Sequence, residues 1–130
     1  MYTRTTHNIK VTVVPSYLDE QSNPQMEHFT WAYSIRLENL GAETVQLINR
    51  YWHITDASGM VQEVRGPGVV GEQPVLRGGD SYRYTSGASL RTSSGLMVGA
   101  YEMAGPQGET FHIDIPAFSL DSPQQMKRAN

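Results

Sequence analysis

Apolar and polar residues alternate along several short stretches of this chain. The pattern is clearest over residues 28–38, where every second side chain is large and apolar: Phe29, Trp31, Tyr33, Ile35 and Leu37. Residues 9–14 repeat it with Ile9, Val11 and Val13. A period of two, carried by aromatic and β-branched residues, is typical of a strand with one buried face. We therefore predict strands over 9–14 and 28–38, with the longer strand in the middle of the core.

A third predicted strand, residues 44–55, changes phase along its length. Its apolar residues fall on odd positions up to Leu47 and on even positions from Trp52 onward. One extra residue swaps the two faces of a strand, so a β-bulge is predicted near residues 48–50. The segment Asp-Ala-Ser-Gly at residues 56–59 then predicts a tight hairpin turn, followed by a short return strand.

The second half of the chain predicts three more strands, over residues 82–86, 96–103 and 111–115. A long connection of small residues, 86–95, separates the first two. Both phases of residues 96–103 are apolar or small, so we expect this strand to be covered on both sides. Pro116 weakens the end of the last strand, because proline cannot donate a hydrogen bond to the ladder.

These elements predict the fold class. No stretch of 10–12 residues shows a sustained helical period, and about eight short strands separated by turns are typical of an all-β protein. We predict a fibronectin-type-III-like (immunoglobulin-like) β-sandwich of about 7–9 strands. We predict that the sandwich domain covers residues 8–118. Residues 1–7 are predicted to form a flexible N-terminus and residues 119–130 a flexible C-terminal tail.

Length, charge and composition exclude several classes of function. The 130 residues suit one domain. The net charge of −3 argues against a general nucleic-acid binder, which needs a basic surface. The chain contains no cysteine, which excludes disulfides and thiolate nucleophiles. We find no signal-peptide pattern and no apolar run of about 20 residues, and therefore expect a soluble cytoplasmic protein without a membrane segment.

Residues 66–74 contain the pattern G-x-G-x-x-G, which also marks dinucleotide-binding turns. Such a turn requires a following helix, whose N-terminus holds the pyrophosphate, and an acidic residue about 20 positions later. Here Pro74 and the pair Gly78-Gly79 leave no room for a helix, and the acidic position falls near Arg91. The sequence therefore argues against a dinucleotide site.

Two other interpretations of this loop stay open. Successive backbone N–H groups of a glycine loop can form an anion nest without a helix. The candidate residues for such an anion or nucleotide loop are Gly66, Gly68, Gly71, Arg65 and Arg77. Alternatively, the glycines serve only positive φ angles and close strand packing.

Other catalytic patterns are missing from the sequence. It has neither the P-loop string nor the G-x-S-x-G elbow of serine hydrolases. The four histidines do not share ligand-like spacing, although His112 and Asp114 fall on one strand face. We therefore expect no catalytic residues, no metal site and no cofactor.

Three connected motifs nevertheless make the chain similar to a known family. They are Arg50-x-Trp52-x-Ile54-x-Asp56-x-x-Gly59, then Val64-x-Gly66-x-Gly68-Val69-Val70-Gly71-x-Gln73-Pro74-x-Leu76, and then Tyr84-x-Ser86-Gly87-x-x-Leu90-x-Thr92-x-x-Gly95-x-Met97-x-Gly99-x-Tyr101-x-Met103. This pattern resembles the ApaG family over essentially the whole chain. The resemblance implies a fibronectin-type-III-like sandwich and a bacterial cytoplasmic protein whose biochemical role is unsettled.

The resemblance also suggests functions. It implies an association with a neighbouring diadenosine-tetraphosphate hydrolase and with cobalt and magnesium resistance. Related domains in F-box adaptors and in a polymerase-delta-interacting protein imply a protein-interaction module. Our leading hypothesis is therefore a non-enzymatic interaction module with an unidentified protein partner. The alternatives are a nucleotide- or pyrophosphate-binding protein that uses the Gly66–Gly71 loop, and a metal-handling protein.

Overall fold

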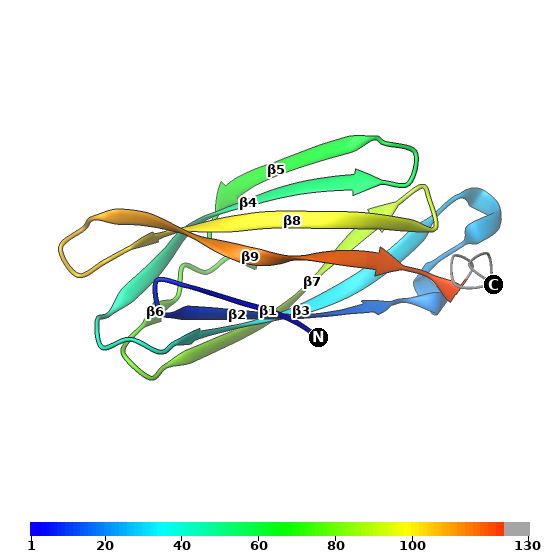
Figure 1. Cartoon of the computed structure of the whole chain (residues 1–130). Coiled ribbons are helices and arrows are strands. Elements are labelled where there is room, and N and C mark those ends of the chain that lie inside the picture. The colour runs from blue at the N-terminus through cyan, green and yellow to red at the C-terminus, as the bar shows by residue number, and fades with distance from the viewer. Residues whose placement is uncertain (124–130) are drawn as a thin grey trace.

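The computed structural model describes residues 1–123 and shows an all-β protein (Figure 1). Within these residues the chain forms nine strands and two single-turn 3₁₀ helices. In chain order they are β1 (Tyr2–Thr6), β2 (Ile9–Tyr17), η1 (Asp19–Gln21), η2 (Pro24–Met26), β3 (Phe29–Asn39), β4 (Val45–Asp56), β5 (Val61–Pro67), β6 (Val75–Leu76), β7 (Ser81–Leu90), β8 (Ser94–Ala104) and β9 (Thr110–Asp121). The predicted fold class and strand number are confirmed.

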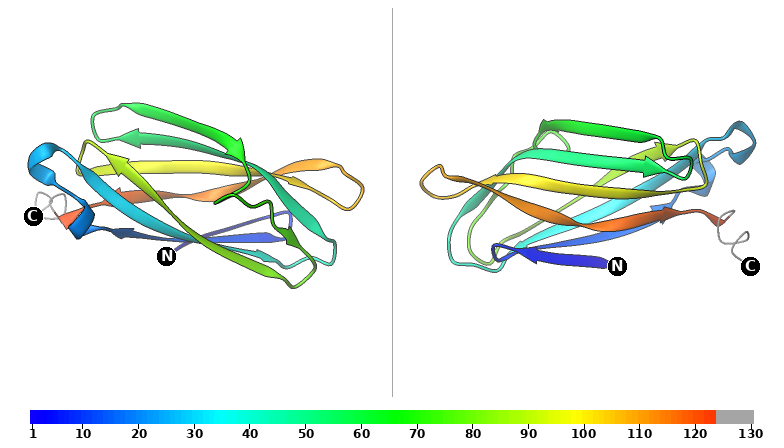
Figure 2. Two further views of the ribbon diagram at one scale, coloured as in Figure 1. Left: turned by 180° about the vertical axis from the view of Figure 1, so that it is seen from behind. Right: turned by 45° about the horizontal axis from the view of Figure 1, so that its top comes forward.

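The strands form two antiparallel sheets that pack face to face (Figures 1 and 2). The first sheet has the order β1-β2-β3-β7. The second has the order β5-β4-β8-β9, and the short β6 also pairs with β4. The arrangement is the predicted β-sandwich, in which every strand turns one face toward the opposite sheet.

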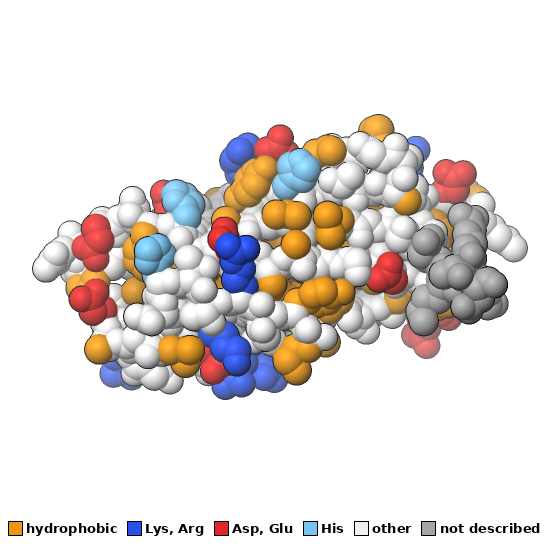
Figure 3. Space-filling model, in the orientation of Figure 1, with side chains coloured by type: hydrophobic (Ala, Val, Ile, Leu, Met, Phe, Trp, Pro, Cys, Tyr) orange, Lys and Arg blue, Asp and Glu red, His pale blue; other side chains and the backbone are white. Residues whose placement is uncertain are grey.

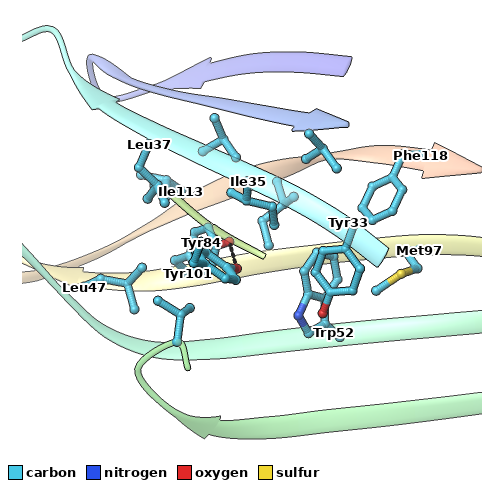
Figure 4. Packing of buried hydrophobic residues seen from close by; sticks show 14 of the residues in the cluster. Tyr33, Ile35, Leu37, Leu47, Trp52, Tyr84, Met97, Tyr101, Ile113 and Phe118 are labelled. Carbon is cyan, nitrogen blue, oxygen red and sulfur yellow. Dashed lines mark hydrogen bonds between the residues drawn. The ribbon is translucent and has the colours of Figure 1, made fainter. Parts of the chain in front are cut away.

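The core lies between the two sheets, and its largest side chains are aromatic (Figure 4). The Trp52 ring lies edge-on to Tyr33 and Phe118, at centroid distances of 5.4 and 5.8 Å. The indole N–H of Trp31 donates to the backbone oxygen of Asp121 at 2.9 Å, which ties β3 to the end of β9. The predicted inward faces of β2 and β3 are buried along their whole length.

The phase change in β4 arises from the predicted bulge. The pairing of β4 with β8 shifts register between Leu47 and Asn49. Ile48 is the extra residue, so odd positions face the core before it and even positions after it. Val45, Leu47, Trp52 and Ile54 are consequently all buried.

The expectation of a flexible N-terminus is wrong. Residues 2–6 form β1 and pair with residues 9–13 of β2. His7 and Asn8 adopt positive φ angles of 49° and 65°, which close a tight turn between the two strands. Arg4 of β1 forms a 2.8 Å ion pair with Asp114 of β9, so β1 also joins the two sheets.

Two further expectations about strand ends are wrong. The predicted connection 86–95 is mostly strand, because residues 86–90 continue β7 and pair with residues 29–33 of β3, with Ala88 opposite Trp31. The last strand does not weaken at Pro116 but continues to Asp121. Pro116 lies at a register shift between β8 and β9, where a missing N–H is tolerated. Of the tail predicted to be flexible, residues 119–121 belong to β9, and 124–130 lie outside the described residues.

Candidate functional site

The glycine loop leaves β5 and enters β6, which is a strand and not a helix. Gly68 and Gly71 have φ angles of +62° and +79°, as expected if glycine supplies the left-handed conformation. Val70, at the tip of the loop, also has a positive φ of 48°, which is strained for a β-branched residue. The loop therefore lacks the helix N-terminus on which a dinucleotide-binding turn holds the pyrophosphate.

Much of the loop backbone is already hydrogen-bonded within the protein. The N–H of Gly68 donates to Ile48 of β4 at 2.8 Å. Val69 and Glu72 bond to each other in both directions, at 2.8 and 2.9 Å. The Val69 side chain is 1% exposed and inserts into the core. These bonds fix the loop against the sandwich and occupy three N–H groups that an anion nest would need.

The structure does not bring the two predicted loop arginines together. Arg65 lies beside Tyr51 of β4, whereas Arg77 follows Leu76, which pairs with Val45. Tyr51 and Val45 are six residues apart on β4, or about 20 Å at roughly 3.3 Å per residue. The Arg65 guanidinium stacks on the Tyr51 ring, 4.6 Å from its centroid. Arg77 instead forms an ion pair with Asp80, at 3.5 Å.

Another arginine, Arg50, contacts the glycine loop, and the site prediction missed it. Its Nη1 donates to the backbone oxygens of Pro67 and Gly68, at 3.0 Å each. A Cβ atom on Gly66 would lie 3.1 Å from this guanidinium, so the glycine leaves space for it. The sequence contains a signal for the inward orientation of Arg50, because Arg50 lies on the same even-numbered side of the strand as the buried Trp52.

Arg50 faces a cleft between the two sheets, which we call the inner cleft. Its volume is about 240 Å³, and its lining residues are Tyr33, Arg50, Trp52, Val69, Val70, Gly71, Tyr84, Thr85 and Ser86. Burial raises the pKa of Tyr33 and Tyr84 above the usual 10.0, and the positive charge of Arg50 opposes that shift in both. The inner cleft thus places a cation among neutral phenols and hydroxyl groups.

A second feature lies on the opposite side of β4, which we call the outer face. Its members are Tyr51, His53, Val61, Glu63, Arg65, Leu96, Val98 and Ala100, which lie in register across β5, β4 and β8. The side chains of Val61, Leu96 and Val98 are 49%, 46% and 40% exposed. Figure 3 shows hydrophobic side chains gathered on this side of the molecule, next to histidine. The expectation that both sides of β8 are covered is therefore wrong.

Potential metal ligands do not gather in the described part of the chain. No group of three His, Asp or Glu side chains within residues 1–123 is placed to hold a metal ion. The carboxylate of Asp114, which shares a strand face with His112, is paired with Arg4. Among the same residues, no helix has the length and apolarity needed to cross a bilayer.

Comparison with known proteins decides the family. A family model described as the ApaG domain matches residues 19–105. The chain belongs to the ApaG family. It is 62% identical to Protein ApaG of Paramagnetospirillum magneticum and 58% identical to Protein ApaG of Brucella canis, over 100% of the chain and of each relative.

Solved structures agree with this membership. A crystal structure of an ApaA protein from Bordetella pertussis superposes with a TM-score of 0.87 at 42% identity, covering 92% of this chain and 98% of that one. The C-terminal domain of wzt reaches a TM-score of 0.56 at 10% identity, covering 92% of this chain and 76% of that one, and shares the fold alone. The resemblance seen in the sequence motifs is thus confirmed for family and fold.

Proposed function

We propose that this ApaG-family chain is a non-enzymatic protein-interaction module that works in the cytoplasm. The observation that carries the proposal is the outer face, where Val61, Leu96 and Val98 expose apolar side chains on one sheet. Exposed apolar side chains that share one sheet face with polar residues are typical of a protein-binding surface.

The polar rim of the outer face supports the same function. Arg65 stacks on Tyr51, and the Tyr51 hydroxyl donates to Glu63 at 3.0 Å. Tyrosine and arginine are enriched where proteins bind each other, because they combine a large contact area with polar groups. Because β5 and β4 hold these side chains in register, they would lose little conformational entropy when a partner binds.

The experiment compares three tagged chains in extracts of the cells that make the protein. The first is unchanged, the second carries Leu96→Lys and Val98→Lys, and the third carries Val14→Lys. Val14 is a matched control, because it is a 47% exposed valine on the other sheet. After cross-linking, we expect the unchanged and Val14→Lys chains to retain the same protein and the outer-face variant to lose it. Equal retention by all three chains, or no protein above background, would contradict the proposal.

A nucleotide or pyrophosphate is the second candidate ligand. It is supported by Val70 and Gly71, which line the inner cleft beside Arg50. An amide-shift titration with ATP, a dinucleoside polyphosphate and pyrophosphate tests it, and shifts confined to Val70 and Gly71 would support it. The absence of shifts at millimolar ligand would remove this candidate. The association with cobalt and magnesium resistance rests on the family resemblance alone.

A further inference from the structure

Strand β7 presents an open edge. It pairs with β3 on one side, and no strand among residues 1–123 pairs with it on the other (Figure 2, left). The edges formed by β1, β9 and β5 are protected. At one side of the sandwich, Arg4 of β1 bonds to Asp114 of β9. The free edge of β5 carries the charges of Glu63 and Arg65 and ends at Pro67. Charged residues and proline are the usual means of blocking strand addition.

The backbone groups that face this open edge follow from the register. The N–H of Asn39 donates to the oxygen of Asp80, its partner at the start of the β3–β7 ladder. Hydrogen-bonded pairs alternate along an antiparallel ladder, so Tyr84, Ser86 and Ala88 bond to β3. The intervening residues, Arg83, Thr85, Gly87 and Ser89, turn their N–H and C=O groups away from β3. The Tyr82 hydroxyl bonds to Glu72 at 3.2 Å, so the glycine loop covers the first part of β7.

The inner cleft opens beside the uncovered part of β7. Thr85 and Ser86 line it together with Arg50 and with Val70 and Gly71 of the glycine loop. An added strand would place its inward side chains next to those of Tyr84 and Ser86, and therefore toward Arg50. The four ion pairs found within residues 1–123 all use other arginines. The guanidinium donates to two backbone carbonyls through Nη1, which leaves Nη2 and Nε for a carboxylate.

A second depression lies farther along the same edge. It has a volume of about 340 Å³, and its lining includes Ser89, Leu90, Met60 and Val61. The side chain of Met60 is 68% exposed, and Val61 borders this depression but belongs to the outer face. Leu90 lies four residues beyond Ser86, or about 13 Å along a strand. Two depressions at strand spacing fit an extended peptide better than one small anion.

We propose that β7 accepts an added strand from a partner protein, whose acidic side chain enters the inner cleft and bonds to Arg50. An apolar side chain four residues away in the peptide contacts Met60. Main-chain bonds to Thr85, Gly87 and Ser89 supply affinity, and the two depressions supply specificity. The inference rests on the proposed interaction function and names the chemistry of one partner segment.

The test uses a displayed library of random twelve-residue peptides. Each peptide is flanked by further residues at both ends, so that it has no free C-terminal carboxylate. Peptides selected on the unchanged chain should share an acidic residue and, four positions away, an apolar one. Exchange of the acidic residue for its amide should weaken binding about tenfold or more, as expected for loss of a charge-assisted hydrogen bond. N-acetylglutamate amide alone should not bind. Selected peptides without a shared acid, or an amino-acid analogue that binds as tightly as the peptide, would overturn the proposal.

Variants of the chain locate the binding edge. Arg50→Gln should weaken the acidic peptide about tenfold but not its amide counterpart, whereas Arg65→Gln, with the same charge change on the outer face, should bind normally. Thr85→Pro should abolish binding, because it removes an outward N–H, whereas Thr85→Ala keeps that N–H and should bind. Thermal melts confirm that each variant folds, and the Thr85 pair tests the edge even if Arg50→Gln unfolds. Equal binding by Thr85→Pro and Thr85→Ala would overturn strand addition.

The same peptide separates this inference from the proposed function. The chain with Leu96→Lys and Val98→Lys should bind the peptide normally, since both changes lie on the outer face. Loss of the cellular partner by that variant, with peptide binding intact, supports both proposals as two surfaces that meet only at Val61. A cellular partner that depends on the outer face, together with no selected peptide, would leave the proposed function standing and remove the β7 inference.

Discussion

The phenol hydroxyl groups of Tyr84 and Tyr101 hydrogen-bond to each other between the sheets, and so join β7 to β8 (Figure 4). Tyr101 is 0% exposed and Tyr84 is 8% exposed. Because the bond is buried, each hydroxyl depends on the other for a partner. The bond links the wall of the inner cleft to the middle of the opposite sheet.

Removing one member of this pair should cost more than removing both. Tyr84→Phe or Tyr101→Phe leaves a buried hydroxyl without its partner, and each should lower the free energy of unfolding by about 1–3 kcal/mol. The double variant should cost less than either single variant, because it leaves no buried hydroxyl without a partner. Urea denaturation of the four proteins measures this coupling. Strictly additive losses would show that the hydroxyl pair is not coupled.

Stability should fall in alkaline solution because of the same tyrosines. Burial is the main reason that the pKa of Tyr84 and Tyr101 lies above 10.0 in the folded protein. The unfolded chain ionises near pH 10. Above that pH the unfolded state therefore binds fewer protons, and the free energy of unfolding should fall by about 1.4 kcal/mol per pH unit for each tyrosine. The contribution is fully present below about pH 10.

Urea denaturation on either side of that pH measures the slope, and tyrosinate absorbance shows which residues ionise. Tyr101→Phe should remove one tyrosine's share of the slope. An unchanged slope in Tyr101→Phe would mean that other groups cause the alkaline loss.

Gly68 and Gly71 should respond differently to alanine, although both have positive φ angles. A Cβ atom on Gly68 would collide with the backbone oxygen of Glu72, whereas one on Gly71 would have open space. Gly71→Ala should lose about 1–2 kcal/mol from the left-handed conformation alone. Gly68→Ala should lose about 2–5 kcal/mol, because overpacking is added. Thermal denaturation gives both values, and equal losses would exclude the collision as the cause.

A substitution at Val70 should raise the stability of the protein. Its side chain is 63% exposed and its φ angle is +48°, so the residue is strained without a compensating burial. Asparagine tolerates this conformation, and Val70→Asn should raise the free energy of unfolding by about 1 kcal/mol. A loss of stability, measured by urea denaturation, would show that the valine makes contacts that outweigh the strain.

Trp52 should anchor the core, as its apolar phase in the sequence predicts. It is 3% exposed and contacts the rings of Tyr33 and Phe118. Trp52→Ala should lower the free energy of unfolding by about 3–5 kcal/mol because it opens a cavity between the sheets. Trp52→Phe keeps part of the ring packing and should cost less. A denaturation midpoint that does not move in Trp52→Ala would disprove this role.

The fold was largely predictable because its signals are local. Alternation over Phe29–Leu37 predicted the central strand, and the phase change after Leu47 predicted the bulge. Errors arose where a residue's role depends on a distant strand. Residues 2–6 form a strand because they pair with β2 and contact β9. The face of Leu96 and Val98 stays uncovered because no further layer of the described chain packs on it.

The candidate site was predicted less well, for the same reason. The sequence identified the glycine loop, but the flanking Arg65 and Arg77 lie beside different parts of β4. Residues that are close in sequence can lie far apart in a sheet, because each residue of a strand moves the chain forward by several ångströms. The Arg50 side chain reaches the loop from β4. In the sequence, only its inward-facing even position on that strand indicates this role.

The sequence by itself therefore determined the strands, the sandwich and the family, since these depend on alternation, turn residues and an extended motif. Only the tertiary structure decided what surrounds each functional group. It showed that hydrogen bonds within the protein occupy three N–H groups of the glycine loop, and that Arg50 faces a cleft. It also showed that β7 ends the sheet with an unpaired edge. These properties depend on which strands become neighbours, and contacts between distant segments set that pairing.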